Sequence, residues 1–220
     1  MLLMNIKKIK VACVVPIKSK SMRIKKKNFR KIGELPLYEI LFKKLKKCNF
    51  DEIYIDSDSS IIKKKTQEYG FKFIKRLPEL SENNANGNDL LNYHSTLIDA
   101  DIYFQLFITA PFISTTTINS CINFIKVNKE YDSILTAKKI YSWFWYKNLP
   151  VNYNPKILPR SQDALPIVQE TTGLYGICRK ALKKYKCRIG KRPYFFFIND
   201  KEALDIDTSE DLKLSNFYLT

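Results

Sequence analysis

The chain alternates short apolar runs with amphipathic segments over most of its length, and this alternation restricts the folds open to it. The run at 11–15 is apolar throughout and rich in valine, as in a strand that is covered on both faces. Connections of more than a dozen residues favour parallel pairing through helical crossovers. The sequence therefore predicts an α/β fold with a doubly wound, mostly parallel sheet, built as one domain over residues 1–220.

The individual elements follow from apolar spacing and from cap residues. The expected strands are 11–15, 53–55, 71–74, 102–108, 133–137, 172–178 and 194–198. The expected helices are 37–45, a helix from a cap at Asp58 or Ser59 to Tyr69, 89–97, 116–127, 179–186 and a helix from Glu210 after a cap at Thr208 or Ser209. We expect Pro16 to end the first strand, because proline supplies no ladder donor.

Residues 138–168 interrupt the alternation. This stretch holds four of the nine prolines and six aromatic residues between Tyr141 and Tyr153. Such a composition is typical of a segment that packs on a substrate or on a second subunit, and we expect a homodimer contact here. An irregular lid folded onto its own core is the alternative.

Composition excludes several classes of protein. No apolar stretch approaches the ~20 residues of a membrane span, and the first residues lack the apolar core of an export signal, so we expect a cytoplasmic protein. The five cysteines have no C-x-x-C pairing, which predicts reduced thiols rather than a zinc site or disulfides. The net charge of +16 is concentrated in residues 1–50, but residues 200–211 are acidic, so we expect neither nucleic acid nor a membrane as partner.

A strongly basic loop follows the first strand. Open α/β sheets bind ligands at the carboxyl ends of their strands, which is where residues 16–28 are expected to lie. The hydroxyls of Ser19 and Ser21 and the cations of Arg23 and Lys27 would form a phosphate cradle there. The chain has no Walker motif. A merely solvated basic loop is the alternative.

Two aspartates near the carboxyl end supply an opposite charge. Asp205 and Asp207 are two residues apart, so in extended backbone they point to the same side. Such a pair can hold Mg²⁺ or Mn²⁺ against a phosphate. Together with the basic loop, the pair predicts a nucleotide and metal site.

Four segments then resemble the acylneuraminate cytidylyltransferase family, whose members activate sialic acids and related keto-sugar acids as CMP derivatives. Residues 16–28 are similar to the family's P-A-R-x-x-S-x-R-x-x-x-K-N signature, and 204–212 to its D-I-D-T-P-E-D-L segment. Residues 75–81 and 106–112 resemble R-P-x-E-L-A and L-Q-P-T-S-P-L more loosely. The chain departs from the family at Lys18 (usually arginine), Lys20 and Lys26 (commonly glycine) and Phe107 (a glutamine).

The resemblance implies a Rossmann-like nucleotidyltransferase fold and a role for each matching residue. The residues implied to bind the CTP phosphates are Lys18, Ser19, Ser21, Arg23, Lys27 and Asn28, and those implied to line the nucleotide pocket are Arg76, Asn86 and Thr109. Asp205 and Asp207 are implied to bind the metal, with Arg23, Lys27 and Asp207 acting in catalysis. The residues implied to receive the acidic sugar are Arg160, Gln162, Glu170, Thr172 and Gly173. Family members are usually dimers built by an excursion like that at 138–168.

The implied reaction is attack of the acceptor's anomeric hydroxyl on the α-phosphorus of CTP, with release of pyrophosphate. His94, the sole histidine, lies in a predicted helix, and we expect it to be structural. Two alternatives stay open. One is another nucleotide-sugar nucleotidyltransferase or a metal-dependent glycosyltransferase of similar fold, and the other is a basic nucleic-acid-binding module.

Overall fold

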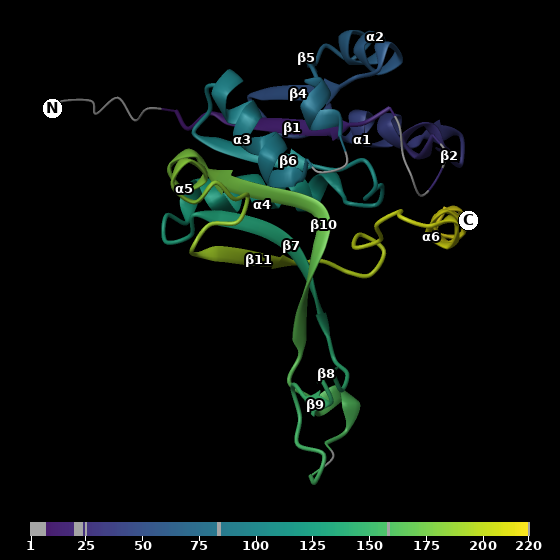
Figure 1. Cartoon of the computed structure of the whole chain (residues 1–220), viewed down its shortest axis with the longest axis vertical. Coiled ribbons are helices and arrows are strands. Elements are labelled where there is room, and N and C mark those ends of the chain that lie inside the picture. The colour runs from purple at the N-terminus through teal and green to yellow at the C-terminus, as the bar shows by residue number, and fades with distance from the viewer. Residues whose placement is uncertain (1–7, 20–23, 25, 83–84, 158, 220) are drawn as a thin grey trace, which may run out of the picture.

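The structure is a computed structural model, which describes residues 8–19, 24, 26–82, 85–157 and 159–219. A seven-stranded sheet forms its centre, in the order β11-β7-β10-β6-β1-β4-β5 (Figure 1). The strands of this sheet are β1 (Val11–Ile17), β4 (Glu52–Ser57), β5 (Lys72–Lys75), β6 (Ile102–Leu106), β7 (Ser133–Ile140), β10 (Ile167–Cys178) and β11 (Pro193–Phe197). Four of the six strand pairings are parallel, and only β10 runs against its neighbours. The predicted mostly parallel sheet is therefore confirmed.

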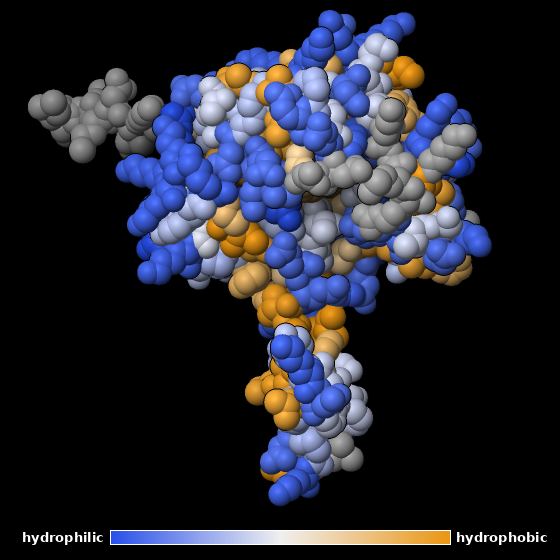
Figure 2. Space-filling model, in the orientation of Figure 1, coloured by the Kyte–Doolittle hydropathy of each residue, from blue (hydrophilic) through white to orange (hydrophobic). Residues whose placement is uncertain are grey.

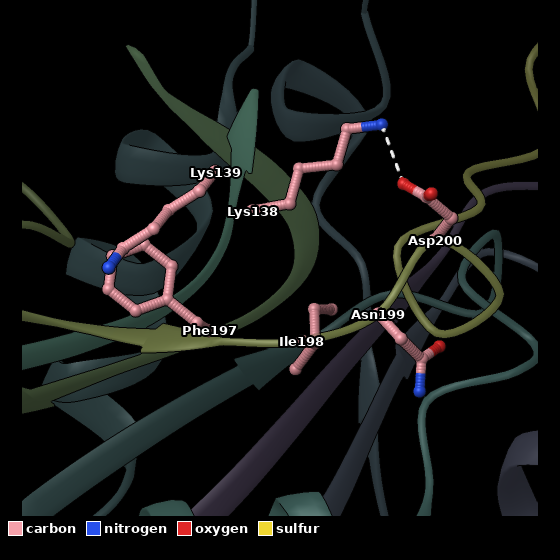
Figure 3. A pocket seen from close by; sticks show the side chains of 6 residues that line it. All are labelled: Lys138, Lys139, Phe197, Ile198, Asn199 and Asp200. Carbon is pink, nitrogen blue, oxygen red and sulfur yellow. Dashed lines mark hydrogen bonds and ion pairs between the residues drawn. The ribbon is translucent and has the colours of Figure 1, made fainter. Parts of the chain in front are cut away.

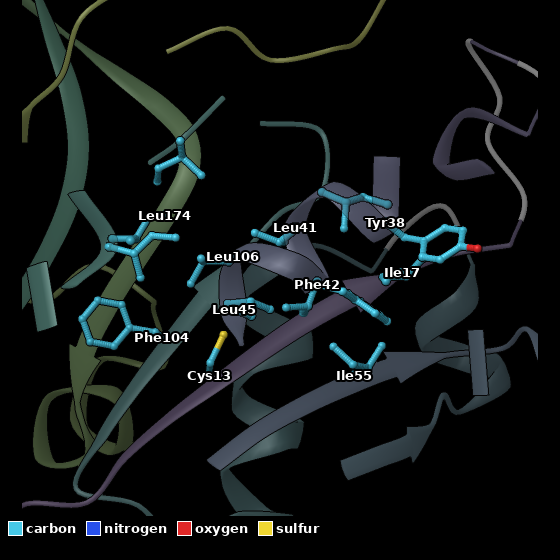
Figure 4. Packing of buried hydrophobic residues seen from close by; sticks show 14 of the residues in the cluster. Cys13, Ile17, Tyr38, Leu41, Phe42, Leu45, Ile55, Phe104, Leu106 and Leu174 are labelled. Atoms are coloured by element: carbon cyan, nitrogen blue, oxygen red, sulfur yellow. The ribbon is translucent and has the colours of Figure 1, made fainter. Parts of the chain in front are cut away.

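Helices cover both faces of the sheet. The α-helices are α1 (Leu37–Leu45), α2 (Ser60–Glu68), α3 (Gly87–Leu97), α4 (Thr115–Val127), α5 (Arg179–Tyr185) and α6 (Ser209–Phe217). Val11, Cys13 and Val15 of β1 pack in one buried cluster with α1 and α4. Figure 4 shows Cys13 in this cluster beside Leu45 of α1. Ala12 and Val14 point the other way, into a second cluster with α3 and α5. This alternation explains why the run at 11–15 is apolar at every position.

The first strand runs beyond the expected stop. Pro16 lies within β1, opposite Asp56 of β4, and the strand ends at Ile17. Pairing of β1 with β6 ends at Val14, so the missing N–H of Pro16 falls outside that ladder. Proline is tolerated where no ladder bond is required of it. The expectation that Pro16 ends the strand is therefore wrong, and the strand runs two residues beyond the expected 11–15.

Residues between β7 and β10 leave the body of the molecule as a long excursion. Its base is the paired ends of β7 and β10, where Ile140 faces Ile167. It carries a small hairpin of β8 (Trp145–Tyr146) and β9 (Leu149–Pro150) and projects away from the sheet (Figure 1). Tyr146 and Leu149 each expose 68% of their surface. Hydrophobic residues gather on this excursion beneath a mainly hydrophilic body (Figure 2).

The remaining elements are short. They are β2 (Lys31–Ile32), β3 (Leu35–Pro36) and the 3-10 turns η1 (Lys27–Phe29), η2 (Pro78–Ser81) and η3 (Ser161–Asp163). All five cysteines are free thiols, and burial raises the pKa of Cys13 and Cys48, the latter to about 11. Within the described ranges, no helix combines the length and apolar character needed to cross a bilayer.

Candidate active site

The basic loop and the acidic segment meet in the folded chain. The ammonium group of Lys27 lies 2.9 Å from Oδ1 of Asp207 and donates a second hydrogen bond of 2.9 Å to the carbonyl of Ile206. Lys27 is 9% exposed, so this contact is partly shielded from solvent. Two oppositely charged segments at distant positions in the sequence therefore form one site at the carboxyl edge of the sheet.

Local backbone structure orients Lys27. The residue opens the turn η1, and Lys26 before it adopts a left-handed conformation with φ of 54°. Asn28 braces the loop by donating from Nδ2 to the carbonyl of Lys18 at 2.6 Å. Lys27 and Asn28 are thus fixed by the fold, whereas Ser21 and Arg23 lie outside the described residues.

Ser19 is tied to the end of β4. Its backbone N–H and its hydroxyl donate to the two carboxylate oxygens of Asp58, at 2.7 and 2.6 Å. This clamp links the loop after β1 to the loop after β4. A phosphate would compete with Asp58 for the Ser19 hydroxyl, so the role of Ser19 in a cradle stays a prediction.

The acidic segment is held in place from three directions. Ile206 is fully buried in the core, between the two aspartates. Its N–H donates to the carbonyl of Thr109 at 2.8 Å, so the turn after β6 lies against this segment. The carboxylate of Asp211 accepts hydrogen bonds from the N–H groups of Asp207 and Thr208, at 3.0 and 2.7 Å. Thr208 caps α6 as predicted, and the helix begins at Ser209.

The ionisation of Asp211 favours this arrangement. Burial opposes its negative charge, but the hydrogen bonds from Asp207 and Thr208 and the charge of Lys27 outweigh burial. They hold the pKa of Asp211 below its usual value. Asp211 therefore stays ionised at neutral pH and can fix the backbone of Asp207.

Asp205 offers the clearest sign of a missing ligand. Its Oδ1 is buried and has no hydrogen-bond partner among the described residues. A buried carboxylate oxygen without a partner is costly unless a ligand or ion satisfies it. No group of three metal-ligating side chains is found in the described parts of the chain. One or two carboxylates together with substrate phosphates are a donor set that Mg²⁺ accepts, so the metal role of Asp205 and Asp207 stays a prediction.

Lys44 and Glu202 support the turn after β6 from behind. The ammonium group of Lys44 donates to the carbonyls of Pro111 and Ile113, at 2.5 and 2.7 Å. Burial lowers the pKa of Lys44. Glu202 accepts from the N–H of Ser114 and the hydroxyl of Thr117, both at 2.8 Å, and so satisfies the start of α4. The turn that carries Thr109 is therefore rigidly held.

Arg76 belongs to a buried charge cluster. Its guanidinium lies 2.9 Å from Oδ2 of Asp56, which also contacts Nε2 of His94 at 3.0 Å. Burial opposes the charge of Asp56, but the hydrogen bond from His94 and the charge of Arg76 hold its pKa below the usual value. The side chain of Arg76 is only 3% exposed. In this geometry Arg76 joins the ends of β4 and β5, and its role in the nucleotide pocket stays a prediction.

Asn86 acts as a helix cap. Its side chain accepts from the N–H groups of Asn88 and Asp89, at 2.8 and 3.3 Å, and Asp89 completes the capping box. Asn86 remains exposed at the start of α3. The residue is therefore held at the surface by a local motif, and its predicted contact with a nucleotide is not tested by this geometry.

The predicted acceptor residues fall in two places. Glu170, Thr172 and Gly173 lie on β10 beside the end of β6, where the N–H of Phe107 donates to the carbonyl of Gly173 at 3.3 Å. A Cβ on Gly173 would lie 3.1 Å from that of Ala110, so glycine permits this close approach. Arg160 and Gln162 lie on the excursion, where Arg160 is bonded to Asp163 at 2.7 Å. Within a single chain, Arg160 and Gln162 therefore lie apart from the other predicted site residues.

A hollow marks the base of the excursion, next to the segment that leads to Asp205. Lys138 and Lys139 line it from β7, and Phe197 to Asp200 line it from the end of β11 (Figure 3). Lys138 pairs with Asp200 at 3.1 Å, and the Lys139 ammonium lies 4.7 Å from the centre of the Phe197 ring. The excursion and the acidic segment are thus adjacent.

Sequence reasoning missed a cluster around β6 and β10. Arg188 lies over the ring of Tyr175, with its central carbon 3.6 Å from the ring centre, and contacts Gln105 at 3.5 Å. Gln105 is fully buried and also donates to the carbonyl of Gly87 at 3.0 Å. The signal that could have drawn attention to this cluster is a polar residue, Gln105, within an otherwise apolar strand.

Two curated proteins with similar sequences are named as cytidylyltransferases. A 3-deoxy-manno-octulosonate cytidylyltransferase of Rickettsia canadensis is 29% identical over 196 residues, which cover 80% of this chain and 75% of that protein. N-acylneuraminate cytidylyltransferase A of Danio rerio is 21% identical over 211 residues, covering 91% of this chain and 49% of that protein.

A solved structure also shares the fold. CMP:2-keto-3-deoxy-manno-octonic acid synthetase, determined with CTP, matches with a TM-score of 0.73 at 16% identity, over 96% of this chain and 98% of that one. The sequence pattern of the cytidylyltransferases matches residues 12–215, a span that includes both halves of the charged site. The chain belongs to the cytidylyltransferase family.

Proposed function

We propose that this protein transfers CMP from CTP to the anomeric hydroxyl of a keto-sugar acid and releases pyrophosphate. The observation that carries the proposal is the contact of Lys27 with Asp207 at 2.9 Å, within a chain whose family is shown. This contact unites a cation suited to phosphate with a carboxylate suited to a metal. The matched relatives are named for the same class of reaction.

The sequence resemblance to acylneuraminate enzymes suggests a sialic-acid-like acceptor, while the relatives favour a different sugar. The Rickettsia canadensis relative, at 29% identity, acts by its name on 3-deoxy-manno-octulosonate, and the Danio rerio relative, at 21%, on an acylneuraminate. Both acceptors are acids with a 3-deoxy-2-keto skeleton. We propose 3-deoxy-manno-octulosonate as the first acceptor to test and a sialic acid as the second.

The side chains of this site have separable tasks in the proposed reaction. Lys27 would hold phosphate oxygens and neutralise charge as pyrophosphate leaves. Asp205 and Asp207 would hold Mg²⁺, which when bound neutralises phosphate charge and polarises the reacting phosphoryl group. Asp211 accepts hydrogen bonds from the backbone N–H groups of Asp207 and Thr208 and so holds the backbone that carries the Asp207 carboxylate before substrate arrives.

Pyrophosphate release provides the test. The protein is mixed with Mg²⁺, each of the four NTPs in turn and either 3-deoxy-manno-octulosonate or N-acetylneuraminate, and pyrophosphate and the CMP-sugar are measured. We expect release with CTP and at least one acid. A metal-dependent glycosyltransferase would release no pyrophosphate, and salt-sensitive RNA binding without turnover would favour a nucleic-acid-binding module.

We also propose that the excursion joins two copies of the chain. Its hairpin leaves Trp145, Tyr146 and Leu149 exposed by 57% or more. Large apolar side chains gathered on a projecting segment are costly in water and typical of a protein contact. In a dimer, such a contact would also carry Arg160 and Gln162 toward a second subunit.

A further inference from the structure

Several contacts hold the side chain of Arg188 at the carboxyl end of β6. Its guanidinium is stacked on Tyr175, 3.6 Å from the ring centre, and lies 5.7 Å from the centre of the Phe107 ring. Its side chain is 22% exposed, so one part of the group reaches solvent. Stacking on an aromatic ring leaves the N–H groups at the edge of a guanidinium available for other partners.

The start of α3 is shaped around this side chain. A Cβ on Gly87 would lie 2.4 Å from Nη1 of Arg188, so any larger residue at this position would displace the guanidinium from where it lies. The N–H of Arg188 also donates to Oδ1 of Asn88 at 2.9 Å. Both the backbone and the guanidinium of Arg188 are therefore held against the start of α3.

The charge of Arg188 is only loosely matched within the chain. Glu170 lies 3.7 Å from Nη2, beyond ordinary hydrogen-bond length, and Glu170 is engaged by the hydroxyl of Tyr175. The contact with Gln105 is also long, at 3.5 Å. A guanidinium has five N–H donors, so Arg188 retains donors for an incoming anion.

Neighbouring charges indicate which anion fits. Burial and the hydrogen bond to Glu170 raise the pKa of the Tyr175 hydroxyl, the charge of Arg188 opposes this, and the charges of Glu170 and Asp205 add to it. The turn after β6 links Arg188 to the acidic segment: the ring centre of Phe107 lies 5.7 Å from the Arg188 guanidinium, and two residues further on the carbonyl of Thr109 accepts from the N–H of Ile206 at 2.8 Å. An acidic sugar entering here would be repelled by Asp205, Asp207 and Glu170 unless a cation received its carboxylate.

We propose that Arg188 binds the carboxylate of the acceptor sugar and thereby selects acids over neutral sugars, an inference that rests on the proposed cytidylyl transfer. The planar guanidinium matches a carboxylate through two parallel hydrogen bonds. Lys27 of the basic loop is paired with Asp207, whereas Arg188 lies over Tyr175 of β10 and beside Glu170. The segment between β9 and β10, which holds Arg160, projects away from the sheet (Figure 1).

The test compares Arg188→Met and Arg188→Lys with a matched control, Arg192→Met. Arg192 is exposed and lies four residues further along the chain. Each protein is assayed with CTP and with 3-deoxy-manno-octulosonate, N-acetylneuraminate and the methyl esters of both. The esters keep the sugar and remove the charge. Thermal melting of each variant reports folding.

We expect Arg188→Met to raise the KM for the acid by about 10- to 100-fold, the loss expected for charge-assisted hydrogen bonds. The KM for CTP and the kcat should change by less than about twofold, and the preference for acid over ester should fall in parallel with the KM effect. Arg188→Lys should recover part of that preference. Arg192→Met should behave as the wild type.

The outcomes separate this inference from the proposed function. One outcome is that the wild type transfers CMP while Arg188→Met shows the wild-type KM for the acid and the wild-type preference for the acid over its ester. That result overturns the assignment of Arg188 and leaves the proposed reaction standing. A selective rise in the KM for CTP overturns it in favour of phosphate binding. If the wild type uses no acid, both proposals fail. If Arg188→Met does not fold, Arg188→Lys provides the test. A preference of Arg188→Lys for the acid over the ester that equals that of the wild type contradicts the bidentate contact.

Discussion

The ammonium group of Lys27 lies 2.9 Å from the carboxylate of Asp207, although 180 residues separate them along the chain. This pair is the meeting point of the two segments that the proposed chemistry requires. Its side chains differ in exposure, at 11% for Lys27 and 34% for Asp207. The carboxylate therefore remains within reach of a ligand while the ammonium group is largely enclosed.

Asp207→Asn should abolish most turnover without unfolding the protein. The amide keeps the shape of the side chain but removes the charge that would hold Mg²⁺, and a loss of about 100-fold or more in kcat is expected. The measurement is pyrophosphate release across a Mg²⁺ titration, with thermal melting as a check on folding. Glu210→Gln, an exposed change in the first turn of α6, is the matched control. Near-normal activity at ordinary Mg²⁺ would refute the metal assignment.

Lys26→Gly should stabilise the basic loop. Lys26 has a φ of 54°, which costs a residue with a Cβ about 1 kcal/mol and costs glycine little. We expect the free energy of unfolding in urea to rise by up to about 1 kcal/mol. Lys64→Gly, the same replacement on the exposed side of α2, should instead lower it by about 1 kcal/mol. An equal decrease in the free energy of unfolding for both variants would contradict the left-handed conformation at Lys26.

Asp56→Asn should destabilise the fold by about 3–5 kcal/mol at pH 7, because it leaves the buried guanidinium of Arg76 without its counter-charge. The pKa of Asp56 is lowered on folding, so its stabilisation is present above the unfolded-state pKa and is lost as pH falls through the folded-state pKa. In urea unfolding measured from pH 7 down to pH 3, the free energies of unfolding of the wild type and the variant should converge as the pH falls. A difference in the free energy of unfolding between wild type and variant that stays constant with pH would contradict this account.

Replacing Leu149 with Glu should convert a dimer into a monomer. The side chain is 68% exposed on the excursion, and a buried charge at a subunit contact would oppose association. Light scattering during gel filtration measures the mass. Val127→Glu, at a residue 75% exposed at the end of α4, provides the control and should leave the mass unchanged. A wild-type protein that is monomeric at micromolar concentration would refute the dimer.

Much of the fold was readable from the sequence because each element carries its own local signal. Apolar spacing predicts α1 at 37–45 with both ends correct, and the Ser59 cap and Gly70, with φ of 70°, bound α2. The error at Pro16 arose because a neighbouring strand, not the residue itself, decides whether a ladder bond is needed. Such long-range pairing is absent from local patterns.

In the candidate site too, the residues that local motifs mark were predicted, and those that depend on long-range packing were not. Lys27 and Asp207 were predicted from their motifs to converge, and the structure brings them into contact. Arg188 was missed because its importance comes from Tyr175, Gly87 and Glu170, which reach it only through the packing of α3 and β10. The burial of Arg76 against Asp56 and His94 was equally invisible, since these residues lie on different elements.

The pairing of Lys27 with Asp207 also has a consequence for biosynthesis. Ribosomes add about 5–20 residues each second, so about 9–36 seconds pass between synthesis of the lysine and of the aspartate 180 positions later. Throughout that interval the nascent basic loop is without its counter-charge. The site is therefore completed only after all seven strands of the central sheet have been synthesised.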